Sequence, residues 1–451
     1  MYPLFTSITW QDYLRAADRE QCVLEAVRRY RASAFFREGL DANAYFRGEN
    51  PTVARKTVLR VKKLRRRDAS GRLRSDSALT DVVGNRIGSG FLHRLVTQQN
   101  QYLLGNGCTL KDEGTKRLLG HDFDRVLAEL GERALLHGVA WLYWNCDHAE
   151  LLEACADPLS GFVALSDELT GEPMLGIQFW QLEARRPLHI RLFEPDGVTL
   201  LRKEGDTLVP LREKRPYVLR RLTDLNGDRT EAAEPWPRLP IIPLWANGEH
   251  CSELTPAIRA KIDAYDRILS DLADNLDRAN DVYWVLNNFG GTAEDVAETL
   301  EQISRLKAVA CVPDGSGQSA TAEPRTIEVP YQARQAALEL LRRNIYEDYM
   351  AMDPDRLTGT QLTNVAIRTA SAAMDLKADR YEWQVFRCVR SLLGLLGVDT
   401  EEIRFRRRTL GNESETVADI AAMREDIDRA TALKLNPYLQ PEEVDALLRN
   451  A

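Results

Sequence analysis

The sequence predicts an α+β protein in which long amphipathic helices join an antiparallel meander of short strands. Residues 255–281, 331–350 and 364–396 repeat apolar side chains every three or four positions, which is typical of long helices. Between about 138 and 245, short apolar runs alternate with turn residues, which is typical of antiparallel strands. Residues 282–329 mix strand and helix patterns, so a small α/β module separates the first two long helices.

The composition excludes several classes of protein. The chain has 451 residues, which suggests two to four structural units at about 100 to 200 residues each. Its net charge of -8 argues against a protein that coats nucleic acid. Seven scattered cysteines without a CxxC pair predict reduced thiols. Because no basic leader and no run of about 18 apolar residues occurs, we predict neither export nor contact with a membrane.

The N-terminal part begins with a helical pattern over 11–38, which Gly48 and Pro51 interrupt further along the chain. A segment rich in arginine and lysine follows from Arg55 to Arg74, and its interspersed apolar residues predict an exposed strand and loop. A solvated face and a subunit contact both fit this segment. Its basic patch consists of Lys62, Lys63, Arg65, Arg66 and Arg67.

The first long helix has a clear start and two contrasting sides. Thr255 is a suitable N-cap, and Pro256 occupies the first helical position. Its apolar seam is formed by Ile258, Ile262, Tyr265, Leu269, Leu272 and Leu276. Its acidic stripe is formed by Asp263, Asp266, Asp271, Asp274 and Asp277, followed by Asp281. A helix of this kind requires neighbours along its whole length.

The C-terminal part continues with two further long helices. Pro330 begins the second one, and Asp353 with Pro354 ends it before the polar loop MDPDRLTGTQLT. The third helix, 364–396, keeps three- and four-residue apolar spacing throughout. A strand at 401–408 and a pair of helices, the first capped by Ser414, complete the chain.

Motifs that would support catalysis are missing from the sequence. The glycine-rich GNRIGSG at 84–90 is neither a phosphate-binding loop nor a dinucleotide fingerprint. His137, Cys146 and His148 lack the second ligand pair of a zinc site. The acidic stripe spreads its carboxylates along a helix, whereas two-metal sites gather them around ions about 3.5 to 4 Å apart. We therefore predict no enzyme activity, no metal and no cofactor.

Several segments, taken in order, resemble the portal proteins of tailed bacteriophages, the siphophage-type family of head-to-tail connectors. YFRGEN at 45–50 is similar to an early aromatic-aromatic-x-Gly element, and YLLGNG at 102–107 to a YLxG segment. GVAWLYWN from residue 138 also fits. The strongest similarity is RLPIIPLWAN, then SEL, IDAYDRILSD and Asn275, in the order of the segment that enters the family's stem.

The resemblance implies a portal fold and a function. The protein would form a ring, usually a dodecamer, at one vertex of the capsid, and the ring would be the channel for DNA packaging and ejection. The segments would be the wing (1–253), first stem helix (254–281), clip (282–329), second stem helix (330–350), tunnel loop (351–363), long helix with the rest of the wing (364–412) and a short crown (413–451).

The resemblance also implies partners. They are other copies of the chain, double-stranded DNA, a terminase, a head-completion or neck protein, and capsid and scaffolding proteins. The protein would lie in the virion, and in the host cytoplasm during assembly. The sequence departs from the family where TGTQLT replaces a Ser-Gly step in the tunnel loop, and in its short crown.

The expected functional residues follow from the demands of a channel. A ring that passes DNA must not hold it, because each neutralised phosphate adds affinity. The acidic stripe would therefore face the tunnel, or form subunit contacts with Arg259, Lys261, Arg267 and Arg278. The basic patch would pair with a neighbouring subunit or face packaged DNA. DNA-facing candidates in the tunnel loop are Asp355, Arg356, Thr358 and Gln361, and docking candidates in the clip are Glu294, Asp295, Glu298 and Glu301.

Two other classes of protein remain open from the residues alone. One is a nucleic-acid-processing enzyme with acidic catalytic residues, and the other is a helical scaffold protein that does not belong to a phage. A metal-dependent nuclease assay and images of the assembled particle distinguish them, because only a portal predicts a ring with a central hole.

Overall fold

The structure is a computed structural model of the whole chain. It describes residues 6–67, 73–223, 229–234, 236–279, 283–287, 321–325, 331–357, 363–398, 402–408, 413–423, 427–436, 438–439, 444 and 447–448. The chain divides into two compact units. The first unit contains Met1–Pro51, Ser89–Lys261 and Arg343–Ala451, and the second contains Thr52–Gly88 and Ile262–Arg342.

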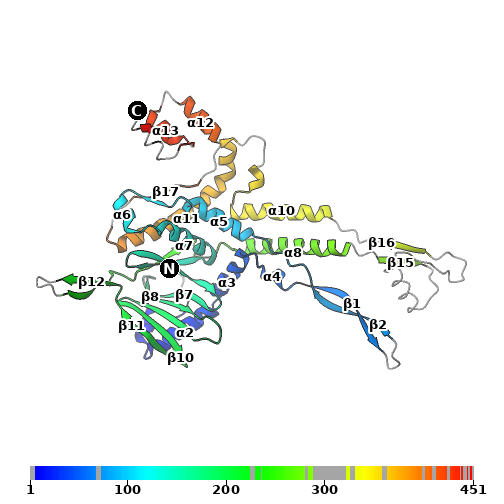
Figure 1. The fold of residues 1–451 in the computed structure, drawn as a ribbon, viewed down its shortest axis with the longest axis horizontal. Coiled ribbons are helices and arrows are strands. Elements are labelled where there is room, and N and C mark those ends of the chain that lie inside the picture. Colours follow the sequence, from blue (N-terminus) through cyan, green and yellow to red (C-terminus); the bar gives the residue numbers. More distant parts are fainter. Residues whose placement is uncertain are drawn as a thin grey trace. The chain divides into compact units, whose positions relative to one another are not determined.

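This division groups the segments in a way that the sequence did not predict. The basic segment after Arg55 belongs with the middle of the chain in the second unit, although it lies within 1–253. Two helices, α8 (Pro256–Ala279) and α10 (Tyr331–Tyr349), contribute residues to both units. Figure 1 shows each of them as one uninterrupted helix.

The N-terminal residues form three helices where the sequence predicted one. Asp18 accepts a hydrogen bond from the backbone of Gln21, and Ser33 accepts one from that of Phe36. Both residues have extended backbone angles. Ser33 ends α2 and begins α3, whereas α1 ends at its C-cap Ala16 and Asp18 begins α2. The helices of the first unit include α1 (Trp10–Arg15), α2 (Arg19–Ala32), α3 (Ala34–Phe46), α5 (Phe91–Leu104), α6 (Glu113–Leu118), α7 (Phe123–His137), α11 (Asn364–Leu395), α12 (Glu413–Ala422) and α13 (Arg429–Leu435).

The predicted meander is present as two main antiparallel sheets. One is six-stranded with the order β11-β10-β9-β8-β7-β6, and the other is three-stranded with the order β14-β4-β5. Smaller pairs are β12 with β13 and β17 with β3. The strands are β3 (Cys108–Leu110), β4 (Val139–Asn145), β5 (His148–Glu153), β6 (Cys155–Asp157), β7 (Ser160–Ser166), β8 (Pro173–Trp180), β9 (His189–Glu194), β10 (Gly197–Glu204), β11 (Thr207–Arg215), β12 (Val218–Thr223), β13 (Arg229–Glu234), β14 (Ile241–Trp245) and β17 (Ile403–Phe405).

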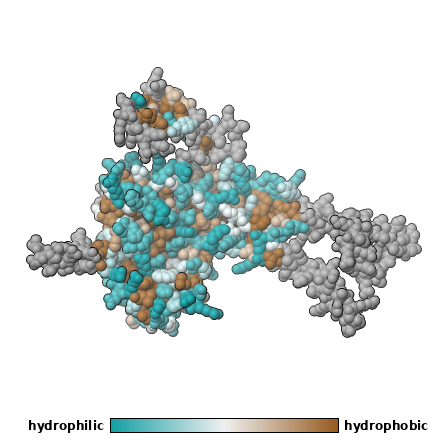
Figure 2. All heavy atoms as spheres, viewed as in Figure 1, coloured by the Kyte–Doolittle hydropathy of each residue, from teal (hydrophilic) through white to brown (hydrophobic). Residues whose placement is uncertain are grey.

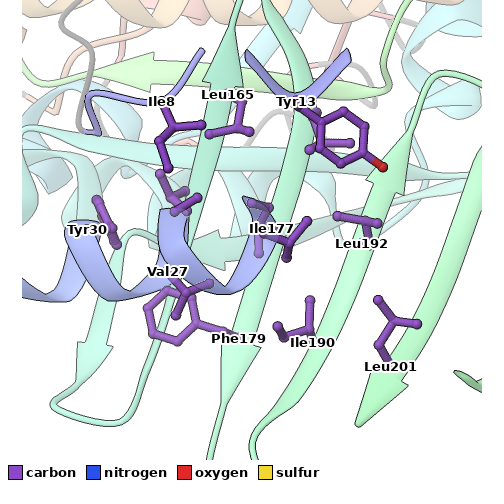
Figure 3. Packing of buried hydrophobic residues seen from close by; sticks show 14 of the residues in the cluster. Ile8, Tyr13, Val27, Tyr30, Leu165, Ile177, Phe179, Ile190, Leu192 and Leu201 are labelled. Carbon is purple, nitrogen blue, oxygen red and sulfur yellow. The ribbon is translucent and has the colours of Figure 1, made fainter. Parts of the chain in front are cut away.

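Strand β7 of the six-stranded sheet is buried on both faces, which explains its nearly continuous apolar sequence. Ile177 of the neighbouring β8 points to one side and packs with Val27 and Tyr30 of α2 (Figure 3), and Val163 of β7 belongs to the same cluster. Phe162, one position away from Val163, belongs to a second cluster with residues of β4 and β14. Successive strand residues point to opposite faces, so one strand supplies both cores.

The junction between α7 and β4 depends on one glycine. Gly138 ends α7 with a φ of 85°, a left-handed conformation that glycine adopts without strain. A Cβ atom at this position would lie 2.9 Å from the carbonyl oxygen of His250. A larger residue would therefore disturb both the turn and the loop that precedes α8.

The second unit contains two strand pairs and most of the two shared helices. β1 (Thr57–Arg67) and β2 (Leu73–Val83) form an antiparallel hairpin, with Thr57 opposite Val83. Pro51–Ala54 form the short helix α4, which precedes this hairpin. β15 (Tyr283–Asn287) pairs with β16 (Thr321–Arg325) inside the predicted clip.

Most predicted elements are confirmed. α8, α10 and α11 differ from their predictions by one or two residues at an end. The polar loop after α10 contains a short 3-10 helix, η1 (Pro354–Leu357). Residues 288–320 of the predicted α/β module lie outside the described residues. Among those residues, no helix is both long and apolar enough to cross a membrane.

Candidate functional site

The start of α8 follows the predicted capping pattern. The hydroxyl oxygen of Thr255 accepts a hydrogen bond from the backbone N–H of Ile258, with a distance of 3.3 Å. Pro256 is the first helical residue, where its missing N–H has no cost. Ile258 and Ile262 are buried, so the first turns of the predicted apolar seam are confirmed.

Further along α8, the buried line is polar. Ile262, Asp266, Ser270 and Asp274 follow one another at intervals of four, and each is at most 5% exposed. Because a helix has about 3.6 residues per turn, these four side chains lie on one face. The sequence predicted that the apolar seam would pack and did not foresee that two members of the acidic stripe would be covered by the chain itself.

Residues on both sides of the hairpin β1–β2 cover this polar line within the second unit. The Lys56 ammonium lies 2.6 Å from an oxygen of Asp274 and 2.7 Å from one of Asp271. The other oxygen of Asp274 accepts hydrogen bonds from the Asn85 backbone N–H at 2.7 Å and from its side-chain amide at 3.0 Å. We call residues 52–56 and 84–88, which flank the hairpin, the strap.

Two further contacts extend the strap along α8. The backbone N–H of Ile87 donates to the hydroxyl oxygen of Ser270 at 3.0 Å. The side-chain amide of Asn85 donates to Asp277 at 2.8 Å. The backbone N–H groups of Asn85 and Ile87 thus donate to side chains of α8. The strap belongs to no strand or helix at these positions, so the side chains supply the acceptors that its backbone needs.

The electrostatics of this contact favour the charged forms of both partners. Burial opposes the ionisation of Asp274, but the Asn85 N–H and the Lys56 ammonium outweigh it, and the pKa of Asp274 lies below its ordinary value. Burial likewise opposes the charge on Lys56, but hydrogen bonds to Asp271 and Asp274 outweigh it and raise its pKa. The strap is therefore held by a charge-assisted network.

These contacts decide how the predicted acidic stripe must be interpreted. Asp266 and Asp274 are buried within the chain, so neither carboxylate can line an aqueous tunnel. Asp271 and Asp277 each have a partner in the strap. Asp263 is half-buried. A tunnel or subunit role stays a prediction for Asp263, for the half-buried Asp271 and for the exposed Asp277.

Some of the basic side chains predicted to pair with this stripe across subunits already form ion pairs within the chain. In the first unit, Arg259 forms an ion pair with Asp41 at 2.8 Å. Lys261 forms one with Asp348. Arg267 is exposed. The side chain of Arg278 lies outside the described residues.

The apolar side of α8 remains partly open. Leu269 and Leu272 are half-buried, and Leu276 is 50% exposed. On α10, Tyr331 and Leu340 are exposed to a similar degree. Figure 2 shows hydrophobic residues gathered over these helices. In the second unit, then, the chain covers the acidic face of α8 more completely than the apolar one.

A buried ion pair fixes the other end of the two shared helices within the first unit. The Lys377 ammonium on α11 lies 2.6 Å from a carboxylate oxygen of Glu253, which precedes α8. The same ammonium donates to the backbone carbonyl of Tyr349 at 2.9 Å and lies 3.3 Å from the centre of its ring. Tyr349 is the last residue of α10. One charged side chain thus joins the chain before α8, the end of α10 and the middle of α11.

The end of α10 is held in a defined conformation. The hydroxyl of Tyr349 donates to the side-chain oxygen of Gln99 on α5 at 2.8 Å. Met350 adopts a left-handed φ of 62°, which costs a non-glycine residue about 1 to 2 kcal/mol. The N–H of Ala351 donates to the carbonyl of Tyr346, which closes the last turn. The loop 351–363 therefore starts from a fixed point.

The remaining predicted residues are placed only in part. Asp355 is exposed on η1, and its N–H donates to Asp353 at 3.1 Å. Arg356 lies in the same 3-10 helix. The basic patch Lys62, Lys63, Arg65, Arg66 and Arg67 lies on β1. Thr358, Gln361 and the clip residues Glu294, Asp295, Glu298 and Glu301 lie outside the described residues.

The described residues do not form a metal site. No three histidine, cysteine, aspartate or glutamate side chains among them come together as ligands. His137 is buried against Asn43 at 2.9 Å, and burial lowers its pKa to about 3. Cys108 lies near Lys116 and Asp124, but burial raises the pKa of its thiol to about 11, so it is protonated at neutral pH.

A model of a known protein family matches this sequence over most of its length. A family model described as "Phage portal protein, SPP1 Gp6-like" matches residues 42–450. The chain belongs to this family. This match confirms the resemblance found in the sequence. Portal proteins are structural rather than catalytic.

Individual relatives carry the same name. A portal protein of Clostridium phage phiCD119 is 26% identical over 357 residues, which cover 75% of this chain and 78% of the relative. The portal protein of Bacillus phage SPP1 is 24% identical over 412 residues, covering 83% and 77%. Among solved structures, a chain from the "Neck of native GTA particle computed with C12 symmetry" is 13% identical with a TM-score of 0.38, covering 80% of this chain and 90% of its own.

Sequence reasoning missed the residues that hold the two shared helices. Lys56 and Asn85 carry no motif, and their partners on α8 lie far along the chain. Lys377 did leave a signal, because it lies three residues after the buried Met374 on the packed side of α11. A lysine at such a position predicts a buried carboxylate partner.

Proposed function

We propose that this portal-family chain forms a ring of about twelve copies, through whose centre double-stranded DNA enters the capsid and later leaves it. The observation that carries this proposal is that the two faces of α8 differ in how far the second unit covers them. The strap covers the acidic face, and the apolar face with Leu269, Leu272 and Leu276 stays partly open. A neighbouring copy would bury that face and repeat the contact around the ring.

The expected segments fit this arrangement. Residues 254–281 and 330–350 would be the stem helices, 282–329 the clip, and 351–363 the tunnel loop. The parts 1–253 and 364–412 would form the wing, although the strap and its hairpin group with the stem residues. Residues 413–451 would be the crown.

The channel would need a surface that does not retain DNA. Each cation that neutralises a phosphate adds salt-dependent affinity and would slow translocation. Asp263, Asp271 and Asp277 are the members of the acidic stripe proposed to face the tunnel or a neighbouring subunit. Asp355, Arg356, Thr358 and Gln361 would approach the DNA at the tunnel loop.

The partners would divide over the surface of the ring. A terminase and a head-completion or neck protein would dock at the clip, with Glu294, Asp295, Glu298 and Glu301 as candidates. Capsid and scaffolding proteins would surround the wing. The basic patch on β1 would contact a neighbouring subunit or packaged DNA. Assembly would take place in the host cytoplasm before the ring becomes part of the virion.

Negative-stain images of the purified chain test the ring. We expect end-on views of closed rings with a central hole. Filaments or separate single chains would contradict the proposal.

In a packaging assay, Asp263→Lys should lower the amount of DNA packaged per capsid, whereas Glu113→Lys, on the exposed end of α6, should not. Equal packaging by both variants would remove Asp263 from the channel wall.

A further inference from the structure

The first unit contains a cavity that the portal function does not use. Its volume is about 350 Å³, which is within the range of about 300 to 1,000 Å³ typical of ligand pockets. It lies where the start of β8, the segment before β14, β14 itself and α11 come together. Residues that define it are Met174, Trp236, Ile242, Trp245, Gln384 and Arg387.

The walls of the cavity are mainly apolar. Two tryptophans and two β14 side chains, Ile241 and Ile242, contribute large apolar surfaces. Pro173, Pro237 and Pro243 also line it. Proline has no backbone N–H, so these positions present a flat hydrophobic surface without a donor. A cavity of this composition suits a large apolar or proline side chain.

Two polar atoms in the cavity's lining residues have no partner. The indole Nε1–H of Trp236 and the side-chain oxygen of Gln384 are buried without a hydrogen-bond partner among the described residues. Leaving such groups unpaired is unfavourable. One is a donor and the other an acceptor, as a peptide group requires.

The rim of the cavity is basic. Arg238 and Arg387 line it and are exposed, and Arg390 is exposed one turn along α11. Arg238 donates to the backbone carbonyl of Ser391, and neither it nor Arg390 forms an ion pair with a described residue. Only one acidic residue, Glu172, is among the lining residues that the structure describes. The rim therefore complements a carboxylate-bearing partner.

We propose that this cavity binds a short extended segment of a partner protein, with a large apolar side chain inserted between the tryptophans and carboxylates against Arg238 and Arg387. Extended proline-containing segments bind aromatic-lined grooves because their backbone is already ordered and keeps its polar groups accessible. The indole N–H of Trp236 would donate to a carbonyl of the segment.

Peptide binding to the full-length chain tests the proposal. The probes are fluorescein-labelled peptides of the pattern Asp-Asp-X-Pro-X-Asp-Asp, with X as Leu, Phe or Trp. Matched peptides replace the four aspartates by lysines, or X by alanine. We expect at least one acidic apolar peptide to bind, by fluorescence anisotropy, at least tenfold more tightly than its lysine and alanine counterparts. Equal binding of the three kinds, or none, would overturn the proposal.

Variants locate the binding to the cavity. Arg387→Glu reverses a rim charge and should weaken binding of the acidic peptide at least tenfold. Trp236→Phe keeps an aromatic ring but removes the N–H donor and part of the apolar surface, and should weaken binding less. Arg117→Glu, on the exposed surface of α6, is the matched control and should bind like the unchanged chain. Unchanged binding by Arg387→Glu would exclude this cavity. Protection of the half-buried Met174 from oxidation in peptide-free rings would instead assign the cavity to a neighbouring copy and overturn the proposal.

Discussion

The ammonium group of Lys377 and the carboxylate of Glu253 lie 2.6 Å apart, with only 14% and 12% of their side chains exposed. Removal of one partner leaves a buried charge without its counterion, whereas replacement of both by apolar residues does not. The pair holds the chain before α8 to α11 and, through Tyr349, to the end of α10. It is therefore the anchor of both proposed stem helices.

The first prediction concerns this pair. Glu253→Ala should lower the free energy of unfolding of the first unit by about 3 to 5 kcal/mol, because Lys377 is left buried and unpaired. The double variant Glu253→Leu with Lys377→Met should recover most of that loss. Urea denaturation followed by circular dichroism measures both.

A surface pair supplies the control. Arg125 and Glu129 on α7 are more than half exposed, and Arg125→Ala should cost less than about 1 kcal/mol. If the double variant of the buried pair were as unstable as Glu253→Ala, the loss would come from packing and not from the unpaired charge.

The second prediction concerns the strap. Asp274→Ala removes the acceptor of the Asn85 N–H and one partner of Lys56, and a hydrogen bond to a charged group contributes about 1.5 to 3 kcal/mol. Hydrogen exchange at the Asn85 amide should therefore accelerate by at least tenfold. Asp277→Ala removes only a contact to the Asn85 side chain and should leave this amide nearly unchanged. Equal acceleration in both variants would show that Asp274 does not hold the strap.

The third prediction follows from the lowered pKa of Asp274. A carboxylate with a lowered folded-state pKa stabilises the fold above its unfolded pKa, near 3.9 for aspartate, and loses that contribution as the pH falls through the folded value. Protection of the Asn85 amide should therefore persist from neutral pH to about pH 4 and decline below it, after correction for the intrinsic exchange rate. A decline centred near pH 6 would require a different titrating group.

Because the pKa of Lys56 is raised, its contact with Asp274 should also weaken at high pH. A lysine with a raised folded-state pKa contributes its stability fully below the unfolded value, near 10.4, and loses it as the pH rises through the folded value. Lys56→Met should remove this alkaline dependence while leaving the acidic one in place. A pH profile of the variant identical to that of the unchanged chain would contradict this role.

The fourth prediction concerns the open apolar face of α8. Leu276→Asp places a charge where a neighbouring copy is expected to bury a leucine, so rings should fail to form while the circular dichroism spectrum is retained. Leu169→Asp, at the 94% exposed tip between β7 and β8, is the matched control and should assemble normally. Normal rings from Leu276→Asp would exclude this face from the subunit contact.

Much of the fold could be predicted from the sequence because local signals specify it. Thr255 with Pro256, and the apolar period of α8, α10 and α11, gave nearly correct bounds. The single helix predicted at 11–38 was wrong because Asp18 and Ser33 act as caps, and the apolar period continues across both. The family also followed from the order of short segments.

The covered face of α8 could not be predicted, because its partners are remote. Lys56 and Asp274 are 218 positions apart, and no local pattern marks either as a member of a pair. The acidic stripe suggested a solvent or subunit surface, since aspartate is seldom buried without a partner. Only the folded chain shows that the strap supplies that partner.

Native mass spectrometry of the purified chain gives the number of copies in the assembly and so tests whether the chain forms a ring. We predict a closed assembly with roughly twelve times the 51.1 kDa mass of one chain, and we expect Leu276→Asp to shift the mass to that of the single chain. A stable monomer or dimer of the unchanged chain, at protein and salt concentrations that preserve its fold, would contradict this prediction.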